Sequence, residues 1–307
     1  MTRPPDAPRD TPSPAGLGET RIGPSTFRWG ERTYVMGILN VTPDSFSGDG
    51  LFRPGGETVR AALERARAMV EEGADLIDVG GESTRPGHEP VDADEERRRI
   101  VPVIAALREA MPDLAISVDT TKPIVAEAAI GAGAAMVNDV WGVAEDDTLA
   151  RLAARRGVPI LLMHNRREAR YVDVVAEVVD ELARATDRAI AVGVPRENII
   201  VDPGFGFGKT VEHNLAVLRD LAALRAIGRP ILLGTSRKST LGRVLDLPPL
   251  ERVEATMATT ALGVASGVDI VRVHDIRANV RTARMADAIV RGTWRPAAAT
   301  TPESAPR

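Results

Sequence analysis

The sequence predicts a single (β/α)8 barrel, and three observations favour this fold. Eight short apolar runs follow one another along the chain; each ends in polar residues or glycine, and each is followed by helix-like sequence. The chain has 307 residues, 44% of them apolar, which is enough for a full core when one barrel takes about 250 residues. In this fold the carboxyl ends of the strands form the rim that carries chemistry. The polar clusters expected there are Asn40–Asp44, Gly81–Arg85, Asp119–Thr120, Asn138–Asp139, Met163–Asn165, Asp202–Lys209, Ser236–Lys238 and Arg272–Asp275.

An open, doubly wound parallel sheet is the alternative that the alternation of strand and helix leaves open. Neighbouring strands lie about 4.8 Å apart, so an open sheet would separate its first and eighth strands by about 30 Å or more. The clusters after the first, seventh and eighth strands are among the richest in polar residues. Closure into a barrel brings them together, and we therefore favour the barrel.

The N-terminal region holds no apolar stretch. Residues 1–21 contain five prolines and scattered charges, and residues 296–307 are rich in Ala, Thr and Pro. We expect both segments to be disordered tails that flank a barrel domain spanning residues 22–295. The segment Phe27–Tyr34 resembles a small hairpin, which we expect to plug the bottom of the barrel.

The first strand is expected at Tyr34–Leu39, and the helix after it shows its period most clearly. Its apolar residues step by three and four, and Gly73 ends it before a second strand at Leu76–Val79. Gly157 and Gly228 are expected to end later helices before the strands Val158–Met163 and Pro230–Leu233. The apolar stripe of the first helix consists of Val59, Ala62, Leu63, Ala66, Met69 and Val70, and that of the long fifth helix of Val175, Val178, Val179 and Leu182.

Composition excludes several kinds of partner. The net charge is −4 and the isoelectric point about 5.7, so nothing in the charge predicts nucleic-acid binding. There is no cysteine, which rules out disulfides and thiolate chemistry. No signal peptide or transmembrane stretch appears, so we expect no membrane partner and a cytoplasmic location.

Strand eight carries an arginine where a buried parallel strand is normally apolar. Its period of two places Arg272 and His274 on one face, beside Ser236 and Lys238 from the end of strand seven. An inward arginine needs an anionic partner, either an internal carboxylate or a bound phosphate. Because the loops after strands seven and eight are a frequent phosphate site in barrels, we favour a phosphate.

Asn40 ends strand one, next to strand eight in a closed barrel. It is either a turn cap or an oxygen ligand for Mg²⁺, which takes few protein ligands and completes its shell with water and substrate phosphates. The four histidines form no zinc-like cluster. Any metal is therefore expected to arrive with the substrate.

Asp119, Asn138 and Asp202 end strands three, four and six. Each alone would more often be a helix N-cap, but three on one rim match a heterocycle with an N–H/NH2 edge. Met163 can offer an apolar face to a flat ring, although a core methionine is the commoner case. The segment Asp202–Lys209 combines alternating glycines with two phenylalanines and a lysine, which suggests a close approach to a flat ligand or a phosphate.

Several of these motifs together resemble dihydropteroate synthases, over residues from about 35 to 292. They are Gly37–Ser47, Gly80–Gly87, Asp202–Lys209, Ser236–Ser239 and Arg272–Asp275. The resemblance implies that the protein condenses 6-hydroxymethyl-7,8-dihydropterin diphosphate with 4-aminobenzoate, with Mg²⁺ as cofactor, and that it is a homodimer through its later helices. The implied pterin residues are Asp119, Asn138, Met163, Asp202 and Lys238; the implied diphosphate residues are Arg272 and His274, with Asn40 on Mg²⁺; and the implied 4-aminobenzoate residues are Thr84, Arg85, Pro86, Phe207 and Ser236.

Two loops are long for this fold, and two positions depart from the family pattern. Thr42–Pro54 and Glu82–Asp92 are interpreted as lids, with ordinary insertion as the alternative. Asn165–Arg167 stands where a glycine-containing loop is common, and Thr240 stands where an aromatic residue often does. A methyltetrahydrofolate:corrinoid methyltransferase and a non-catalytic pterin-binding paralogue remain alternatives. The first would not need the diphosphate residues.

Overall fold

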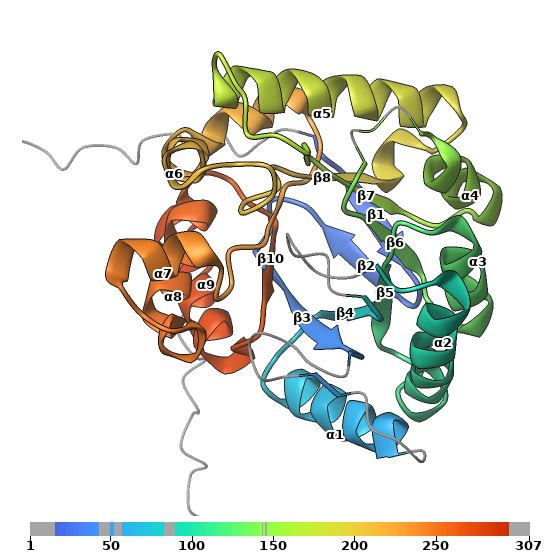
Figure 1. Ribbon diagram of the computed structural model, residues 1–307. Coiled ribbons are helices and arrows are strands. Elements are labelled where there is room, and N and C mark those ends of the chain that lie inside the picture. Colours follow the sequence, from blue (N-terminus) through green and yellow to red (C-terminus); the bar gives the residue numbers. More distant parts are fainter. Residues whose placement is uncertain are drawn as a thin grey trace, which may run out of the picture.

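Eight parallel strands form a ring that helices surround (Figure 1). The computed structural model describes residues 16–42, 50–51, 57–82, 90–142, 144 and 146–294. Within these residues the strands pair in the order β8-β7-β6-β5-β4-β3-β10-β9, and a parallel bridge between Val201 and Ile231 joins the two ends. This confirms the predicted barrel and removes the open sheet. The strands are β3 (Tyr34–Asn40), β4 (Leu76–Gly80), β5 (Ala115–Asp119), β6 (Met136–Asp139), β7 (Ile160–Met163), β8 (Ile199–Asp202), β9 (Leu232–Leu233) and β10 (Ile270–Val273).

The helices lie on the outside of the ring and bury one face each. In the first of them Ala62, Ala66 and Met69 are fully buried as predicted, whereas Val70 lies at the edge of the stripe and is 40% exposed. Gly73 and Gly157 have φ of +104° and +65°, the left-handed backbone that ends a helix at little cost in glycine. The helices are α1 (Glu57–Glu71), α2 (Ala93–Ala110), α3 (Pro123–Ala132), α4 (Thr148–Arg156), α5 (Val174–Ala191), α6 (Val211–Arg219), α7 (Ser239–Leu245), α8 (Val253–Ala265) and α9 (Ile276–Val290), with 3-10 turns η1 (Arg196–Asn198), η2 (Leu221–Ile227) and η3 (Pro249–Glu251).

A hairpin plugs the barrel, but it lies earlier in the chain than expected. Strands β1 (Glu19–Ile22) and β2 (Ser25–Arg28) pair antiparallel, so β1 begins inside the range 1–21 that we assigned to a tail. The missed signal is an alternation in β1, where Thr20 and Ile22 are buried between exposed neighbours. The Trp29 indole N–H donates to Thr20 Oγ1 at 2.9 Å, which ties the hairpin together.

The core has two layers that meet at the sheet. Outward-facing strand residues pack on the helices, while the inward-facing residues of the lower ring pack on the hairpin. Phe27 and Trp29 of the hairpin stack at 5.9 Å between ring centroids and fill the bottom of the barrel. The inward residues of this lower layer are Tyr34, Met36, Leu76, Ala115, Met136, Leu161, Ile200, Leu232 and Ile270.

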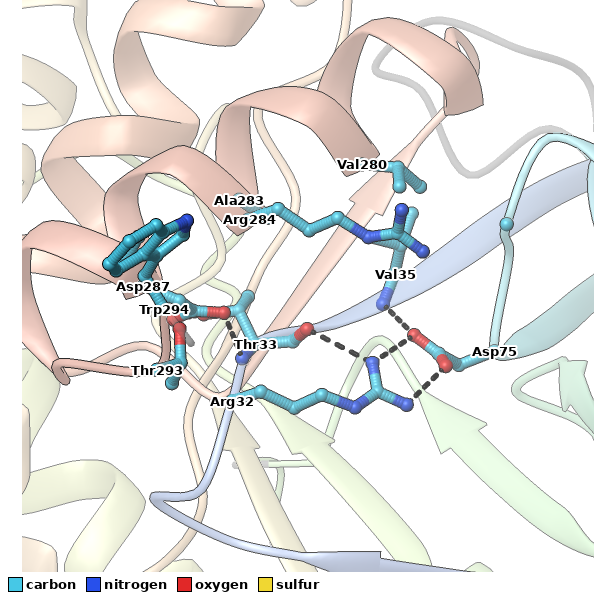
Figure 2. A pocket seen from close by; sticks show the side chains of 12 residues that line it. Arg32, Thr33, Val35, Asp75, Val280, Ala283, Arg284, Asp287, Thr293 and Trp294 are labelled. Carbon is cyan, nitrogen blue, oxygen red and sulfur yellow. Dashed lines mark hydrogen bonds and ion pairs between the residues drawn. The ribbon is translucent and has the colours of Figure 1, made fainter. Parts of the chain in front are cut away.

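Polar pairs fasten the outer edge of the barrel bottom, beside a cavity of about 420 Å³ (Figure 2). Arg32 donates to both carboxylate oxygens of Asp75, and Thr33 donates to Asp287 from its backbone N–H and its hydroxyl. Arg32 and Thr33 precede β3, Asp75 precedes β4, and Asp287 lies in the last turn of α9. The cavity therefore lies at the opposite end of the barrel from the polar rim, and its lining has its own internal partners.

Candidate active site

The polar residues of the rim rise directly above the apolar lower layer. Along β4 and β5 the inward positions are Leu76, Asp78 and Gly80, then Ala115, Ser117 and Asp119, because successive side chains alternate across a strand. Asn138 pairs in register with Asp119 on the neighbouring strand. The side chains of Asp78, Ser117, Asp119 and Asn138 are all buried. The barrel interior thus changes from apolar to polar about halfway up.

Arg272 crosses the interior and binds two carboxylates. Its Nε donates to Asp78 Oδ2 at 2.6 Å and its second terminal nitrogen donates to Asp119 Oδ2 at 2.8 Å, reaching over β3. The arginine side chain is 19% exposed, while Asp78 is fully buried. The internal carboxylate that the sequence left as an alternative is therefore present. A contact between Arg272 and a diphosphate stays a prediction.

Burial raises the pKa of Asp119, and the neighbouring Arg272 opposes that effect. Burial alone would lower the pKa of the Arg272 guanidinium. The charges of Asp78 and Asp119 outweigh this desolvation, so its pKa is raised. Lys238 also acts on Asp119 and lowers its pKa. A ligand that supplies hydrogen-bond donors is favoured in this part of the interior.

Four buried oxygens on β4, β5 and β6 have no hydrogen-bond partner among the described residues. A buried acceptor left unpaired costs about 1–3 kcal/mol, so such atoms normally have a partner. Four on adjacent strands indicate a ligand rich in N–H groups. They are Asp78 Oδ1, Ser117 Oγ, Asp119 Oδ1 and Asn138 Oδ1.

Asp202 faces the same interior from β8. Its Oδ1 accepts the backbone N–H of Gly204 at 2.6 Å, so one oxygen fixes the following turn. Gly234 shows how closely the neighbouring side chains approach. A Cβ atom built on this glycine would lie 3.8 Å from Arg272 Cβ and 3.9 Å from both Asp202 Oδ2 and Lys238 Nζ. Gly234 therefore marks a point where side chains from the ends of β8, β9 and β10 converge. Burial raises the pKa of Asp202, with Lys238 acting against it.

The glycine-rich segment folds tightly over this point. A Cβ at Gly204, where φ is +67°, would lie 1.7 Å from the backbone oxygen of His164, so only glycine fits. Lys238 donates to the backbone oxygen of Phe205, and its Nζ lies 4.4 Å from the centroid of the Phe207 ring. This lysine therefore has a neutral partner and an aromatic face as well as the interior acids.

Lys209 anchors the segment from the other side. Its Nζ donates to the backbone oxygens of Gly204 and Phe207, each at 3.1 Å, and lies 2.9 Å from His164 Nδ1. Burial lowers the pKa of Lys209 to about 7. Burial, together with the charges of Lys209 and Arg166, lowers the pKa of His164 to about 2. Sequence reasoning placed Lys209 in the motif but missed His164 as its partner.

Ser236 and His274 meet where β9 and β10 end. The serine Oγ accepts the backbone N–H of His274 at 3.1 Å and lies 2.9 Å from its Nδ1. Arg237, by contrast, binds Asp275 through two nitrogens at 2.9 and 2.5 Å, so its charge is matched inside the protein. Of the two cations that follow β9, Lys238 therefore faces the interior and Arg237 does not.

The remaining predicted residues divide by position. Met163 is 3% exposed and pairs in register with Asp202, while Asn40 ends β3 with a partly exposed side chain. Thr84, Arg85 and Pro86 lie outside the described residues, as does most of the loop Thr42–Pro54. At the base of the other long loop, Glu82 accepts the backbone N–H of Val91 at 3.0 Å.

Comparisons with known proteins agree with this geometry. A sequence profile of the family described as pterin binding enzyme matches residues 36–274. The dihydropteroate synthase of Clostridium beijerinckii is 49% identical over 272 residues, which cover 88% of this chain and 99% of the relative. That of Bacillus subtilis is 49% identical over 267 residues, covering 87% and 92%. This chain belongs to the dihydropteroate synthase family.

Solved structures extend the likeness to three dimensions. A dihydropteroate synthase from Clostridium difficile, crystallised in the presence of pteroic acid, has a TM-score of 0.82 and 49% identity and covers 86% of this chain and 99% of its own. One from Xanthomonas albilineans with 4-aminobenzoic acid has a TM-score of 0.78 and 42% identity, covering 84% and 93%.

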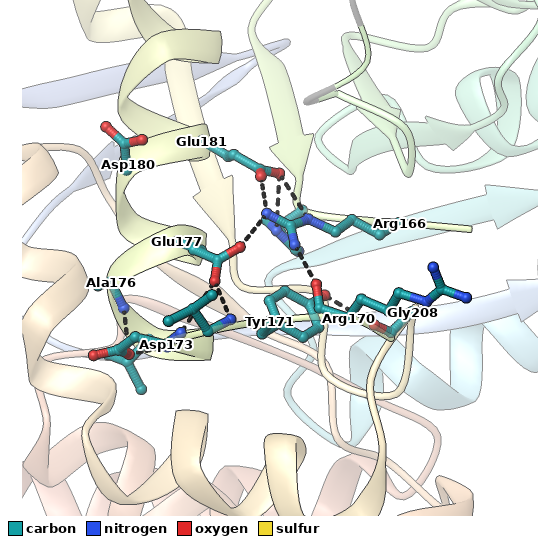
Figure 3. A network of polar contacts seen from close by, with 12 residues as sticks. Arg166, Arg170, Tyr171, Asp173, Ala176, Glu177, Asp180, Glu181 and Gly208 are labelled. Atoms are coloured by element: carbon teal, nitrogen blue, oxygen red, sulfur yellow. Dashed lines mark hydrogen bonds and ion pairs between the residues drawn. The ribbon is translucent and has the colours of Figure 1, made fainter. Parts of the chain in front are cut away.

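Both departures from the family pattern have structural partners. Arg166 binds Glu177 and Glu181 of α5 and stacks on Tyr171 at 4.4 Å from the ring centroid (Figure 3). Tyr171 donates to the backbone oxygen of Gly208 at 2.8 Å, which links this loop to the glycine-rich segment. Arg166 and Tyr171 thus brace this loop against α5 and the glycine-rich segment.

Thr240, in the first turn of α7, also supports the glycine-rich segment. Its Oγ1 accepts from Asn214 Nδ2 at 3.0 Å, and Asn214 Oδ1 accepts the backbone N–H of Gly206 at 2.7 Å. Both departures therefore support the glycine-rich segment from outside. Neither removes a residue of the polar interior.

Proposed function

We propose that the polar interior and rim of the barrel hold the two substrates of the dihydropteroate synthase reaction. That reaction condenses 6-hydroxymethyl-7,8-dihydropterin diphosphate with 4-aminobenzoate and releases diphosphate, a step of folate biosynthesis. The observation that carries the assignment to this site is the group of four buried oxygens on β4, β5 and β6 that have no hydrogen-bond partner among the described residues; three of them belong to Asp78, Asp119 and Asn138 and are acceptors. A pterin offers ring N–H groups and a 2-amino group, which are the donors such acceptors need.

The pterin is assigned to Asp119, Asn138, Asp202 and Lys238, with Met163 against the ring. Asp119 and Asn138 end neighbouring strands in register, so their free oxygens lie on one side of the interior. A carboxylate can accept two parallel N–H groups, and hydrogen bonds to a charged group contribute about 1.5–3 kcal/mol.

The diphosphate is assigned to the end of the barrel where Ser236, Lys238 and His274 gather. Arg272 lies beneath them, and its two carboxylate partners set its orientation. Asn40 offers one amide oxygen nearby, since β3 pairs with β10. Among the described residues no group of three or more His, Asp or Glu side chains could hold a metal. Asn40 is proposed as a ligand of an Mg²⁺ ion that arrives with the substrate, because its amide oxygen is a hard donor; such an ion would supply charge that stabilises the departing diphosphate.

The chemistry needs no covalent intermediate on the protein. The bond between the methylene carbon and the diphosphate oxygen breaks, and its electron pair leaves with the diphosphate. The amine of 4-aminobenzoate forms the new C–N bond and then loses a proton. Lys238 and His274 face the charge that develops on the leaving group. A dissociative, SN1-like course follows, because the dihydropterin ring can share the positive charge left on carbon.

The pocket for 4-aminobenzoate is assigned to Phe207 and Ser236 with Thr84, Arg85 and Pro86. Lys209 and Lys238 both hold the glycine-rich segment, so the Phe207 ring is presented on a fixed backbone. The two long loops are proposed to exclude water, which competes with the amine for the carbocation-like carbon.

A diphosphate-release assay tests the function. We expect release by the wild-type protein only when the pterin diphosphate and 4-aminobenzoate are both present, in a 1:1 ratio with the dihydropteroate formed. Removal of Mg²⁺ by a chelator should slow the reaction. Absence of release in a protein that still binds pterin would instead identify a non-catalytic paralogue.

A homodimer through the later helices is proposed on the distribution of exposed apolar side chains. On η3, α8, α9 and the turn after them, five apolar side chains are each more than 60% exposed: Leu250, Leu262, Met285, Ile289 and Trp294. Helices α7, α8 and α9 lie together on one side of the barrel (Figure 1). Light scattering should give twice the chain mass for the wild type and the chain mass for Ile289→Glu.

A cytoplasmic location is proposed as well. Within the described residues no helix has the length and apolar character needed to cross a bilayer.

A further inference from the structure

Asp78 lies beneath the residues assigned to the pterin and binds two of their neighbours. Its side chain is fully buried, and a single oxygen, Oδ2, accepts from both Arg272 Nε at 2.6 Å and Asn138 Nδ2 at 2.8 Å. A carboxylate has no proton to donate, so only the NH2 end of the Asn138 amide can face it. The carboxylate therefore decides which way round this amide stands.

The consequence appears on the opposite end of the same amide. Asn138 Oδ1 is buried and has no partner among the described residues. The NH2 end of an asparagine carries two N–H donors, and Asp78 engages one of them here. The end of the Asn138 amide that points away from Asp78, and so can face a ligand, is its oxygen.

Arg272 is fixed by the same group. Its Nε end is held by Asp78 and its outer nitrogen by Asp119, which defines the plane of the guanidinium across the interior. Loss of Asp78 would free one end of the arginine and leave a charge partly unmatched. Of its two carboxylate partners, Arg272 would then keep only Asp119.

We propose that Asp78 is a positioning residue that sets the donor and acceptor pattern of the pterin site. It turns the Asn138 oxygen toward the ligand and fixes the plane of Arg272, so the site selects a heterocycle that presents an N–H group at this point. This inference rests on the proposed function, because it takes Asn138 to be a pterin contact. Asp78 acts on the ligand through Asn138 and Arg272.

Reversal of the hydrogen bond provides the test. An amide oxygen at position 78 could take the place of Oδ2 and keep both bonds, so the single variant is Asp78→Leu. It removes the acceptor, and Asn138 is then free to turn its NH2 group toward the N–H of the ligand. In the double variant Asp78→Asn/Asn138→Asp, the amide at position 78 donates to a carboxylate at position 138, whose second oxygen again faces the ligand as an acceptor. Affinity for a pterin, affinity for diphosphate with Mg²⁺, and melting temperature are measured for both.

We expect Asp78→Leu to weaken pterin binding at least 10-fold and the double variant to recover to within about 3-fold of wild type, since a decade corresponds to 1.4 kcal/mol. The control is Asp269→Leu. It also removes a buried acid, but one that precedes β10 and accepts the backbone N–H of Ile231, so pterin affinity should not change. A folded Asp78→Leu protein with wild-type pterin affinity would overturn the proposal, and so would a double variant as weak as the single one.

Two further measurements keep the result interpretable. The wild type is titrated first: no pterin binding there would defeat the proposed function itself, whereas binding that survives Asn138→Ala would defeat only the inference. If Asp78→Leu does not fold, the side-chain amide of Asn138 is followed by NMR in the wild type. Slow hydrogen exchange with and without pterin supports the bond to Asp78, and fast exchange in the pterin complex contradicts it.

Discussion

Asp202 illustrates how one side chain can serve the fold and the ligand with different atoms. Its Oδ1 holds the Gly204 N–H, and its Oδ2 lies toward Lys238. The turn-capping role and the binding role, which the sequence presents as alternatives, are therefore compatible.

The variant Asp202→Asn separates these roles. The amide oxygen can keep the Gly204 bond, while the NH2 group replaces Oδ2 and faces the ligand donors. Pterin affinity should fall at least 10-fold, because hydrogen bonds to a charged acceptor are worth about 1.5–3 kcal/mol each. Diphosphate affinity should change little. Calorimetry on both ligands measures this, with Asp139→Asn as control, since Asp139 is a buried acid of β6 that accepts the Trp141 N–H. Unchanged pterin affinity in the folded Asp202→Asn protein would remove this residue from the site.

His164 makes the stability of the protein depend on pH. Its pKa is about 2 in the folded chain against 6.5 ordinarily, so between these values the unfolded chain takes up a proton that the folded one refuses. The free energy of unfolding should therefore fall as pH drops below 6.5, by up to about 1.4 kcal/mol per pH unit from this group.

Urea unfolding of the wild type and of His164→Asn, from pH 7.5 to pH 5, measures that contribution. Asparagine can still accept from Lys209 but does not titrate, so the variant should show the shallower loss below pH 6.5. If the stability of the two proteins falls with pH in parallel, the folded protein must protonate His164. The proton would then lie between His164 Nε2 and Glu181 Oε2, which are 3.1 Å apart.

The sequence allowed the site residues at the strand ends to be predicted, but not those in the layer below. Asp119, Asn138 and Asp202 could be found because each ends a strand before a polar loop. Asp78 was missed although its signal is present: an acid at the centre of the apolar run Leu76–Gly80. The pairing of Lys209 with His164 could not be predicted, since it depends on how two loops 45 residues apart pack.

At the scale of elements, the glycine-rich segment is held mainly by Lys209. Lys209→Met keeps the aliphatic stem and loses the donors to Gly204 and Phe207. Because the segment carries Phe207, we expect the KM for 4-aminobenzoate to rise about 10-fold with a smaller change in pterin affinity. Steady-state kinetics test this against Arg167→Met, which removes an exposed cation from the facing loop. A pterin defect as large as the KM change would assign the segment to the pterin instead.

The hairpin β1–β2 is the element that the barrel needs at its base. Phe27→Ala should lower the free energy of unfolding by about 3–5 kcal/mol, because it opens a cavity against the lower layer of inward residues. Thr26→Ala, on the exposed face of the same strand, should cost no more than about 1 kcal/mol. Chemical denaturation of the two variants gives the comparison; equal small losses would show that the hairpin is dispensable.

Prediction of elements from the sequence worked where the apolar period was long. The eight strands and the stripe of α1 follow from spacing, and closure follows from the need to gather the polar clusters. The hairpin was placed too late in the chain because a four-residue strand with two buried positions has almost no period to read. Its position is fixed by tertiary packing under the barrel.

At the scale of the whole molecule, the barrel interior is apolar below, and above it carries buried acceptors that no described residue pairs with; this upper part is proposed to receive a pterin. The lower half is filled by the hairpin and the inward strand residues, so the ligand can enter only from the rim. The unpaired oxygens of Asp119 and Asn138 then mark where the N–H groups of the pterin must lie.

A crystal structure of the protein with 7,8-dihydropteroate tests that claim most directly. We expect the pterin ring inside the barrel mouth, with its N–H and NH2 nitrogens within about 3.2 Å of Asp119, Asn138 and Asp202. Asn138 should meet the ligand through its oxygen while its nitrogen remains on Asp78. A pterin bound elsewhere, or bound in the mouth with these acceptors still unpaired, would contradict the account.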